Sequence, residues 1–459
     1  MFLDNFEKFG VTADANKILP GMVYVDLLEN KNRKEIYDAY KNGASVIYTT
    51  QNISDPELPV IKVNDVQETM LLLLDSYFKK PQNKIKLVAV SGSSDKDIVM
   101  DLLNKMLCKG NAGYEQYLNS INNMNIEDMY EYIDNLAAEG DLILPLMIDY
   151  KLKYFKFVRG FNFDCALITG ITSIDMKDKN YVLNGISSFA TRISPNRPII
   201  INNDDPMLLK AVEANKNTIL ISYGLNKKAA VTATSIDENL QTNFTYCLQR
   251  SFTTNSGQLL EPFEMPITMN MLDNRSLYNA LGAITCALYY DVDIAHIQEI
   301  LKAYRPPHRR FELTAHGEVT ILDNCCSSAG ELDKLLESAQ GLNYRKIKMM
   351  ISVNRSEETF ALESILQVLS QWSDVLGVSD VVFCGCTDIN DELQPLTLHE
   401  IRHLNKAMNS IAKVKYFDKL GDAAEFMKKK LEPGDLLILA GGDEMNTSRS
   451  MMTNQSRLH

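Results

Sequence analysis

Short apolar runs alternate with amphipathic stretches along most of the chain, and this pattern predicts an α/β fold. Residues 87–90 form a continuous apolar run that is typical of a buried parallel strand. Small residues follow this run, and then Val99, Leu102, Leu103 and Met106 recur at helical spacing. The sequence therefore predicts a strand, a tight turn and an amphipathic helix over residues 84–107.

The same alternation divides the chain into three predicted α/β units, at residues 1–83, 84–305 and 306–459. In the first unit we expect strands at 22–27, 45–50 and 60–63, helices at 33–42 and 66–78, and a polar linker at 79–83. In the second we expect further strands at 142–148, 165–171 and 198–202, a β-rich addition at 218–223, 230–235 and 244–250, and helices at 276–290 and 294–304. In the third, strands at 319–323, 347–353, 380–384 and 435–440 alternate with helices at 331–340, 357–369, 398–411 and 422–430. Strand–helix alternation of this kind predicts parallel sheets covered by helices on both faces.

Composition and charge narrow the classes of function. The chain has 459 residues and a net charge of -12, which argues against nucleic acid as a partner. Its apolar runs fall short of the roughly 20 residues that span a bilayer, and its first residues lack the pattern of a secretory signal. Eight cysteines without framework spacing fit reduced thiols. We therefore expect a cytoplasmic protein without a membrane or nucleic-acid partner, and the sequence leaves its oligomeric state open.

The turn after residues 87–90 has part of the chemistry of a phosphate-binding loop. Such loops present backbone N–H groups to a phosphate at a helix N-terminus and read Gly-x-x-Gly-Lys-Thr/Ser. The chain instead has the run Gly92-Ser93-Ser94-Asp95-Lys96-Asp97. The lysine is present, but two carboxylates replace the second glycine and the magnesium-binding hydroxyl.

The order of motifs resembles the Mur ligase family, most closely its MurE type. The matching runs are Leu19-Pro20-Gly21-Met22-Val23-Tyr24-Val25 ("pGdlFva"), Asn42-Gly43-Ala44 ("GA"), Ile201-Asn202-Asn203-Asp204-Asp205-Pro206 ("N-x-DDP"), Tyr278-Asn279-Ala280-Leu281 ("xNALAA") and Arg309-Arg310-Phe311-Glu312 ("GRxE"). The resemblance implies three domains: an N-terminal UDP-binding-like domain, a central ATPase-like domain with a P-loop-like parallel sheet, and a C-terminal Rossmann-like domain. It implies peptidoglycan-precursor ligase ancestry, with ATP and magnesium as cofactors.

The resemblance also assigns candidate nucleotide-binding residues, namely Gly92, Ser93, Ser94, Lys96, Asp97, Asn202, Asp205, Asn279 and Arg310. Asp204 and Asp323 belong to the same pattern. One interpretation is a vestigial nucleotide site between the second and third domains. The alternative is structural: aspartate and asparagine cap turns, and Arg310 pairs with an acid across the hinge.

Several family positions have lost their expected residue types. By resemblance, the magnesium glutamate falls at Met147, the "DH" pair at Ile174-Asp175 and the carbamylated lysine at about Gly185. The nucleotide-sugar "DSR" becomes Asp14-Ala15-Asn16, the "DNPR" that grips diaminopimelate becomes Asp388-Ile389-Asn390-Asp391, and the "GKGHE" strand end becomes Gly441-Gly442-Asp443-Glu444. We assign no catalytic residue and no metal ligand from this pattern.

Electrostatics favour loss of ATP turnover. A carboxylate about 4 Å from a phosphate, at an effective dielectric constant of 20, costs roughly 4 kcal/mol. Lys96 offsets part of this repulsion, and we expect it to pair with Asp95 or Asp97. The hypothesis is a degenerate Mur ligase that binds or scaffolds, its partner a cell-wall precursor or another ligase-pathway protein. The alternative is an active ATP-dependent amide ligase in which Asp97 binds magnesium directly.

Two further motifs suggest metal chemistry and have simpler explanations. His399-Glu400-Ile401-Arg402-His403 spells the zinc-protease signature, but both histidines fall opposite the apolar stripe of the predicted helix, which favours a solvated face. Cys325-Cys326 and Cys384-Gly385-Cys386 follow predicted strands but lack the usual zinc-ligand spacing. His308 and His316 flank the predicted hinge, where we expect exposed loop residues.

Overall fold

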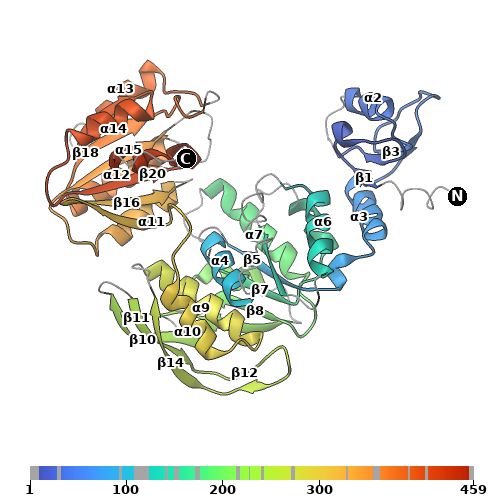
Figure 1. Cartoon of the computed structure of the whole chain (residues 1–459), viewed down its shortest axis with the longest axis horizontal. Helices are drawn as coiled ribbons and strands as arrows, with labels where there is room; N and C mark the ends of the chain where they lie inside the picture. Colours follow the sequence, from blue (N-terminus) through green and yellow to red (C-terminus); the bar gives the residue numbers. More distant parts are fainter. Residues whose placement is uncertain are drawn as a thin grey trace.

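The computed structural model describes most of the chain. The described residues are 10–27, 33–92, 96–107, 124–138, 140, 143–148, 155–170, 176–212, 218–226, 228–238, 242–269, 274–326, 329–353, 355, 362–390, 393–408 and 412–453. They form three α/β units in chain order, and Figure 1 shows the middle one adjoining the other two. Among these residues, no helix combines the length and the apolar character needed to cross a bilayer.

The first unit is a four-stranded parallel sheet in the order β1-β2-β3-β4. Its strands are β1 (Val11–Thr12), β2 (Val23–Val25), β3 (Val46–Thr49) and β4 (Val60–Lys62), and its helices are η1 (Ala15–Lys17), α2 (Lys34–Lys41), α3 (Val66–Tyr77) and η2 (Pro81–Asn83). The stretch predicted as a polar linker forms η2 and is partly buried, because Gln82 donates to Asp75 Oδ1 at 2.7 Å. The chain therefore enters the second unit along an ordered path.

The second unit is one eight-stranded sheet in the order β14-β11-β10-β9-β8-β7-β5-β6. Its strands are β5 (Lys86–Ser91), β6 (Ile143–Ile148), β7 (Cys165–Ile168), β8 (Pro198–Asn202), β9 (Ile219–Tyr223), β10 (Val231–Glu238), β11 (Thr242–Leu248) and β14 (Phe263–Met269). Pairing is parallel from β6 to β10 and antiparallel beyond. The predicted β-rich addition is thus a continuation of the central sheet.

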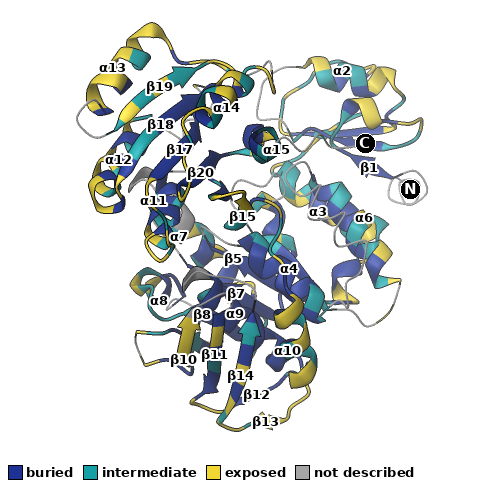
Figure 2. Ribbon diagram, turned by 60° about the vertical axis from the view of Figure 1, so that its left-hand side comes forward, coloured by how far each residue is buried: buried dark blue, intermediate teal, exposed yellow. Residues whose placement is uncertain are grey.

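Helices cover this sheet and carry the candidate residues at their ends. They are α4 (Lys96–Leu107), α6 (Ile126–Ala137), η3 (Phe155–Gly160), α7 (Met176–Ala190), α8 (Pro206–Val212), α9 (Asn274–Tyr289) and α10 (Ile294–Ala303), and a small hairpin pairs β12 (Phe252–Thr253) with β13 (Leu259–Leu260). Helix α4 packs against α9 and α10. Val99, Leu102 and Leu103 of α4 are fully buried, as their helical spacing predicts (Figure 2).

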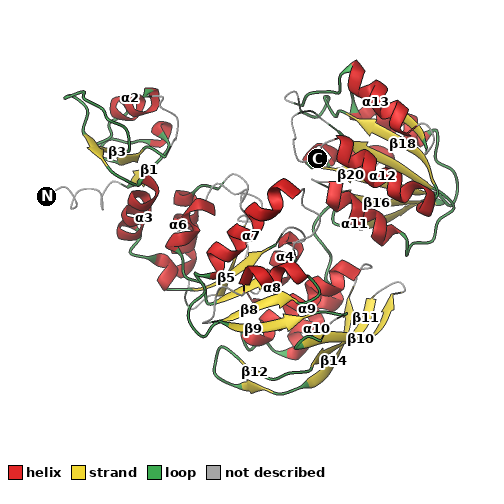
Figure 3. Cartoon of the chain, turned by 180° about the vertical axis from the view of Figure 1, so that it is seen from behind, coloured by secondary structure: helices red, strands yellow, loops and turns green. Residues whose placement is uncertain are grey.

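The third unit is a six-stranded sheet in the order β15-β16-β20-β17-β18-β19, parallel except for the β15–β16 pair. Its strands are β15 (Glu312–His316), β16 (Val319–Cys325), β17 (Ile347–Ser352), β18 (Val378–Cys384), β19 (Lys413–Phe417) and β20 (Leu436–Gly441). Its helices are α11 (Ala329–Ala339), α12 (Leu362–Leu376), α13 (Leu398–Met408), α14 (Leu420–Lys428), η5 (Asp443–Met445) and α15 (Ser448–Thr453). Two separate cores, one beneath α11–α13 and one beneath α14 and α15, show that helices cover both faces (Figure 3).

Candidate functional site

The candidate residues of the second unit gather at the carboxyl edge of its parallel strands. Strand β5 ends at Ser91, and Thr169 after β7 donates its backbone N–H to the Ser91 carbonyl at 2.9 Å. Asn202 ends β8, two strands from β5. Because parallel strands end at the same side of a sheet, segments far apart in the chain lie side by side there.

Gly92 is required by the close packing of two strand ends. Its φ of +141° lies in the region that favours glycine, and a Cβ at this position would lie 2.1 Å from Thr169 Oγ1. The glycine therefore keeps the backbone of the turn close to the end of β7. Ser93, Ser94 and Asp95, which complete the candidate loop, lie outside the described residues.

Lys96 begins α4 and is 8% exposed. Its ammonium donates to the Gly92 carbonyl oxygen at 2.7 Å, so the lysine binds the backbone of its own turn. We predict a pairing of Lys96 with Asp95 or Asp97. Asp95 lies outside the described residues, and Asp97 pairs with an arginine that leads into the third unit.

Asp97 and Arg310 form an ion pair between the first turn of α4 and the segment that leads into the third unit. The two side chains are 28% and 25% exposed, respectively, so the pair is partly shielded from water. Arg310 also donates to the Cys325 carbonyl at 3.5 Å. The structural interpretation of Arg310, that it pairs with an acid across the hinge, is confirmed.

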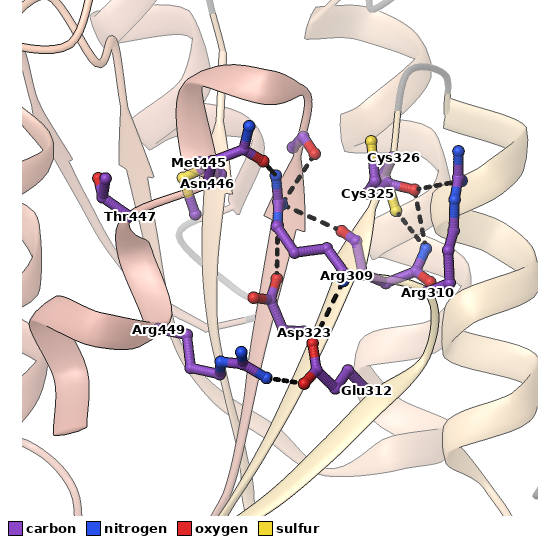
Figure 4. Close-up of polar contacts among 12 residues, drawn as sticks. Arg309, Arg310, Glu312, Asp323, Cys325, Cys326, Met445, Asn446, Thr447 and Arg449 are labelled. Carbon is purple, nitrogen blue, oxygen red and sulfur yellow. Dashed lines mark hydrogen bonds and ion pairs between the residues drawn. The ribbon is translucent and has the colours of Figure 1, made fainter. Parts of the chain in front are cut away.

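Arg309 points the opposite way and is buried in the third unit (Figure 4). Its guanidinium donates to Asp323 Oδ1 at 2.8 Å, to the Gly441 carbonyl at 3.0 Å and to Asn446 Oδ1 at 3.2 Å. Its φ of +56° is unusual for a residue with a Cβ, and it stands where the "GRxE" pattern has glycine. Sequence reasoning missed this role, and the arginine at the glycine position of the pattern was a local signal for it.

Asp323 is fully buried, and its Oδ1 accepts the hydrogen bond from Arg309. Burial raises the pKa of Asp323, although the arginine opposes that shift. Next to it, burial alone would raise the pKa of Glu312, but the Arg449 ion pair and the hydrogen bond from the Arg309 backbone N–H together hold that pKa below its ordinary value. These contacts connect the hinge segment to β16, β20 and α15.

The acidic turn after β8 is held by local hydrogen bonds. Asn202 Oδ1 accepts from the backbone N–H of Asp204 at 3.0 Å, and Asp205 Oδ1 accepts from that of Met207 at 2.9 Å. Asp204 Oδ2 accepts from the Tyr278 hydroxyl at 2.8 Å, so it connects the turn to α9. Burial, together with this carboxylate, raises the pKa of Tyr278. These three residues therefore serve as caps and cross-links.

Asn279 differs from the other candidates because its side-chain nitrogen is buried and unpaired within the described part of the chain. The residue is 4% exposed, and its Nδ2 finds no acceptor among the residues that the structure describes. Helix α9, which carries it, packs against β7, β8 and β9. A buried donor without an acceptor costs about 1–3 kcal/mol, so this amide fits a polar ligand or water.

The family's magnesium ligands do not fit the residues described here. Met147 in β6 stands at the glutamate position, and Phe155 lies 3.2 Å from where a Cβ on Gly185 would be. Ile174 and Asp175 lie outside the described residues. Within the described ranges, no group of three histidine, cysteine, aspartate or glutamate side chains could hold a metal ion. Of the positions that the resemblance assigns to magnesium ligands, Met147 offers no oxygen donor and Asp97 is engaged by Arg310.

The other family positions have structural roles. Asp14 Oδ1 accepts from Asn16 N at 2.9 Å and caps η1, while Asp388 accepts from the backbone N–H groups of Leu420 and Gly421 and caps α14. Glu444 accepts from Ser352 Oγ and, at 2.9 Å, from Gly442 N. Asp391 lies outside the described residues.

The zinc-protease signature lies on α13. Leu404 and Met408 are buried, and His403 Nε2 lies 2.9 Å from Glu363 on the surface, as the solvated-face interpretation predicts. His308 and His316 are exposed, also as expected. Cys325 and Cys384 end β16 and β18, and burial raises the pKa of the Cys325 thiol.

Comparisons with known proteins agree with this architecture. The family model "Mur ligase middle domain" matches residues 148–287. A UDP-N-acetylmuramoyl-L-alanyl-D-glutamate–2,6-diaminopimelate ligase from Syntrophomonas wolfei is 21% identical over 95% of this chain and 90% of that protein. The ligase of the same name from Caldanaerobacter subterraneus is 24% identical, and that match covers 65% of this chain and 62% of that protein's length.

Solved structures share the fold over nearly the whole chain. MurF from Acinetobacter baumannii superimposes with a TM-score of 0.67 at 16% identity, covering 97% of this chain and 93% of that one. MurF from Thermotoga maritima, in complex with ADP, gives 0.66 at 14% identity and covers 98% of each. The fold is therefore the three-domain α/β architecture that these MurF structures have. The predicted resemblance to the Mur ligase family is confirmed, by the middle-domain match and by the shared fold.

Proposed function

We propose that this protein is a catalytically degenerate, MurE-like member of the Mur ligase family that acts by binding or scaffolding. The observation that carries the proposal is the Asp97–Arg310 ion pair. The resemblance assigns both residues to the nucleotide site, yet each neutralises the other. A triphosphate would have to displace Asp97 from Arg310 or do without the arginine.

The pair changes how the site disfavours a nucleotide. An unpaired Asp97 would repel a phosphate by roughly 4 kcal/mol at about 4 Å. When Asp97 is paired with Arg310, its repulsion of a phosphate is weaker. The same pairing also weakens the attraction of Arg310 for a phosphate. Lys96 is directed at the Gly92 carbonyl, so a second cation is held by the protein's own backbone. We therefore expect weak binding of Mg-ATP and no turnover.

Calorimetry with Mg-ATP on the full chain tests this proposal. We expect a dissociation constant above about 1 mM for the natural protein. Asp97→Asn removes the charge and frees Arg310, and Asp97→Ser also restores the hydroxyl, so each should tighten binding by about tenfold or more. Asp101→Asn, the same change one helical turn further along α4, is the matched control and should leave affinity unchanged. Micromolar binding by the natural protein, with ADP released upon addition of UDP-muramoyl peptides, would refute degeneracy.

A second candidate function is an active ATP-dependent amide ligase with a rearranged metal site. The unsatisfied Asn279 amide favours it, because a buried free donor suits a ligand. In this case Asp97 would bind magnesium, and both Lys96→Ala and Asp97→Asn should abolish a measurable ATPase. The degenerate protein has no such activity to lose, so one assay separates the two candidates.

The binding partner of this protein is proposed from its resemblance to peptidoglycan-precursor ligases. A cell-wall precursor or another protein of the ligase pathway is the partner that a peptidoglycan-ligase fold would engage. Seven described cysteines are all free, which supports a reducing compartment. Analysis of what copurifies with the full chain, whether nucleotide, metal or protein, tests this assignment.

A further inference from the structure

Three sulfur atoms meet at the carboxyl edge of the third sheet. Cys384 ends β18, Cys386 follows two residues later, and Met445 comes from η5, after β20. The Sγ atoms of the two cysteines lie 3.4 Å apart. Met445 Sδ lies 3.8 Å from Cys384 Sγ and 3.9 Å from Cys386 Sγ. All three residues are completely buried.

The backbone after β18 is built to bring the second cysteine back to the first. Cys386 has φ = +51°, a left-handed conformation that is uncommon for a residue with a Cβ. Hydrogen bonds on either side fix this turn to the end of β19: Gly385 N donates to the Phe417 carbonyl at 2.9 Å and Thr387 N to the Asp418 carbonyl at 3.0 Å. The two thiols are thus held in place by rigid secondary structure.

The third donor is positioned by a glycine. Gly441 ends β20 with φ = +156°, and a Cβ there would lie 2.6 Å from Met445 Cγ. The absence of a side chain lets Met445 pack against the strand end. Two strands, β18 and β20, therefore deliver three sulfurs from positions about 60 residues apart in the chain.

We propose that Cys384, Cys386 and Met445 form a trigonal site for a soft monovalent d¹⁰ cation, Cu(I) being the physiological candidate. Three atoms separated by 3.4, 3.8 and 3.9 Å lie on a circle of radius about 2.1 Å, close to the metal–thiolate bond length of about 2.3 Å. Thiolate and thioether sulfur are the donors that select Cu(I). An ion at the centre would bind all three with little rearrangement.

The surroundings favour a three-coordinate ion over zinc. Zinc in structural sites takes four ligands in a tetrahedron, whereas these sulfurs supply three. Glu444, an acid whose charge acts on Cys384, is already held by Ser352 and Gly442. Loading releases one proton from each thiol to solvent: Cu⁺ and two RSH give a Cu(SR)₂(thioether) centre of charge -1 and two H⁺.

The hydrogen bond with Cys386, together with burial, raises the pKa of the Cys384 thiol, which lowers the nucleophilic reactivity of this thiol. Such thiols also pack as small apolar groups, and Cys384, Cys386 and Met445 all belong to the core beneath α14 and α15. The convergence of the thioether with both thiols is what distinguishes a ligand set from simple core packing.

Anaerobic titration of the reduced full chain with Cu(I), against a competing Cu(I) chelator, tests the proposal. We expect one equivalent to bind, with a first shell of three sulfurs by X-ray absorption. Cys384→Ser and Cys386→Ser should each weaken binding at least 100-fold, and Met445→Leu, which preserves volume, about tenfold. Cys165→Ala removes a fully buried thiol of the second unit and should leave binding unchanged.

Several results would overturn the site. These are no stoichiometric binding, binding that survives loss of Cys384 or Cys386, or a two-sulfur shell unaffected by Met445→Leu. Formation of a Cys384–Cys386 disulfide with loss of two titratable thiols under mild oxidant, without Cu(I) binding by the reduced protein, would instead identify a redox pair. If the serine variants do not fold, Met445→Leu still decides the question, because its core volume is conserved.

Discussion

The carboxyl edges of the second and third sheets have the same topology and opposite chemistry. At the second sheet, a cation from the hinge and an acid from α4 pair in a partly exposed position. At the third, Arg309 is fully buried and three sulfurs lie nearby among apolar side chains. Parallel strands create the meeting point in both cases, but the side chains decide its use. A shared fold therefore does not imply a shared site.

Arg309 and Arg310 are adjacent, and the comparison predicts very different costs for their loss. Arg309→Ala leaves Asp323 buried without its partner and should lower the free energy of unfolding by about 3–5 kcal/mol. Arg310→Ala should lower it by about 1 kcal/mol or less, because its pair with Asp97 is partly solvated. Urea unfolding of both variants measures the difference. Equal losses would mean that the two edges are energetically alike.

Gly441 ends β20 and Gly92 directly follows β5. Replacing each glycine should show at which edge the lost stability is larger. Gly441→Ala meets three atoms within 3.0 Å, from Ser352 and Met445, and should cost about 3 kcal/mol. Gly92→Ala meets Thr169 Oγ1 and should cost about 2 kcal/mol. Gly257 also has a positive φ but has open space around it, so Gly257→Ala measures the cost of backbone strain alone, about 1 kcal/mol. The reverse order in thermal unfolding would contradict the packing argument.

The amino end of β20 predicts a pH dependence of the free energy of unfolding. Burial alone would raise the pKa of Asp435, but hydrogen bonds from Lys348, at 2.7 Å, and Arg345 hold that pKa below its ordinary value. Its stabilisation is therefore present above about pH 4 and is lost as pH falls through the lowered pKa. Unfolding measured between pH 3 and 7 should show a slope of up to about 1.4 kcal/mol per pH unit at the acid end. Asp435→Asn should flatten that slope, whereas Glu337→Gln, on exposed α11 surface, should not.

The smallest effect is expected for the coupling across the hinge. A double-mutant cycle of Asp97→Asn and Arg310→Gln should give a coupling of about 0.5–1 kcal/mol, falling with added salt. The pair joins residues more than 200 positions apart. A coupling energy of zero would mean that this contact does not hold the hinge segment to the second unit. It would also remove the physical basis for the proposed loss of ATP binding.

Local pattern predicted most of the parallel framework. Strands β5, β8, β17 and β20 were predicted from runs of consecutive apolar residues, because a strand buried on both faces has few polar residues. Helices α6, α7, α8 and α15 and strands β1, β12, β13, β14, β15 and β19 were missed. Several of these elements lie at edges or carry mixed patterns, where tertiary contacts override propensity.

The sequence by itself determined the three-unit α/β order, the altered phosphate loop and the loss of family residue types such as glutamate at Met147. Only the tertiary structure decided that Asp97 pairs with Arg310, that Arg309 is buried against Asp323, and that Met445 joins two cysteines. The physical reason is range. Periodicity reports the face that a residue turns to its near neighbours, whereas these contacts depend on which strand ends pack together across dozens or hundreds of residues.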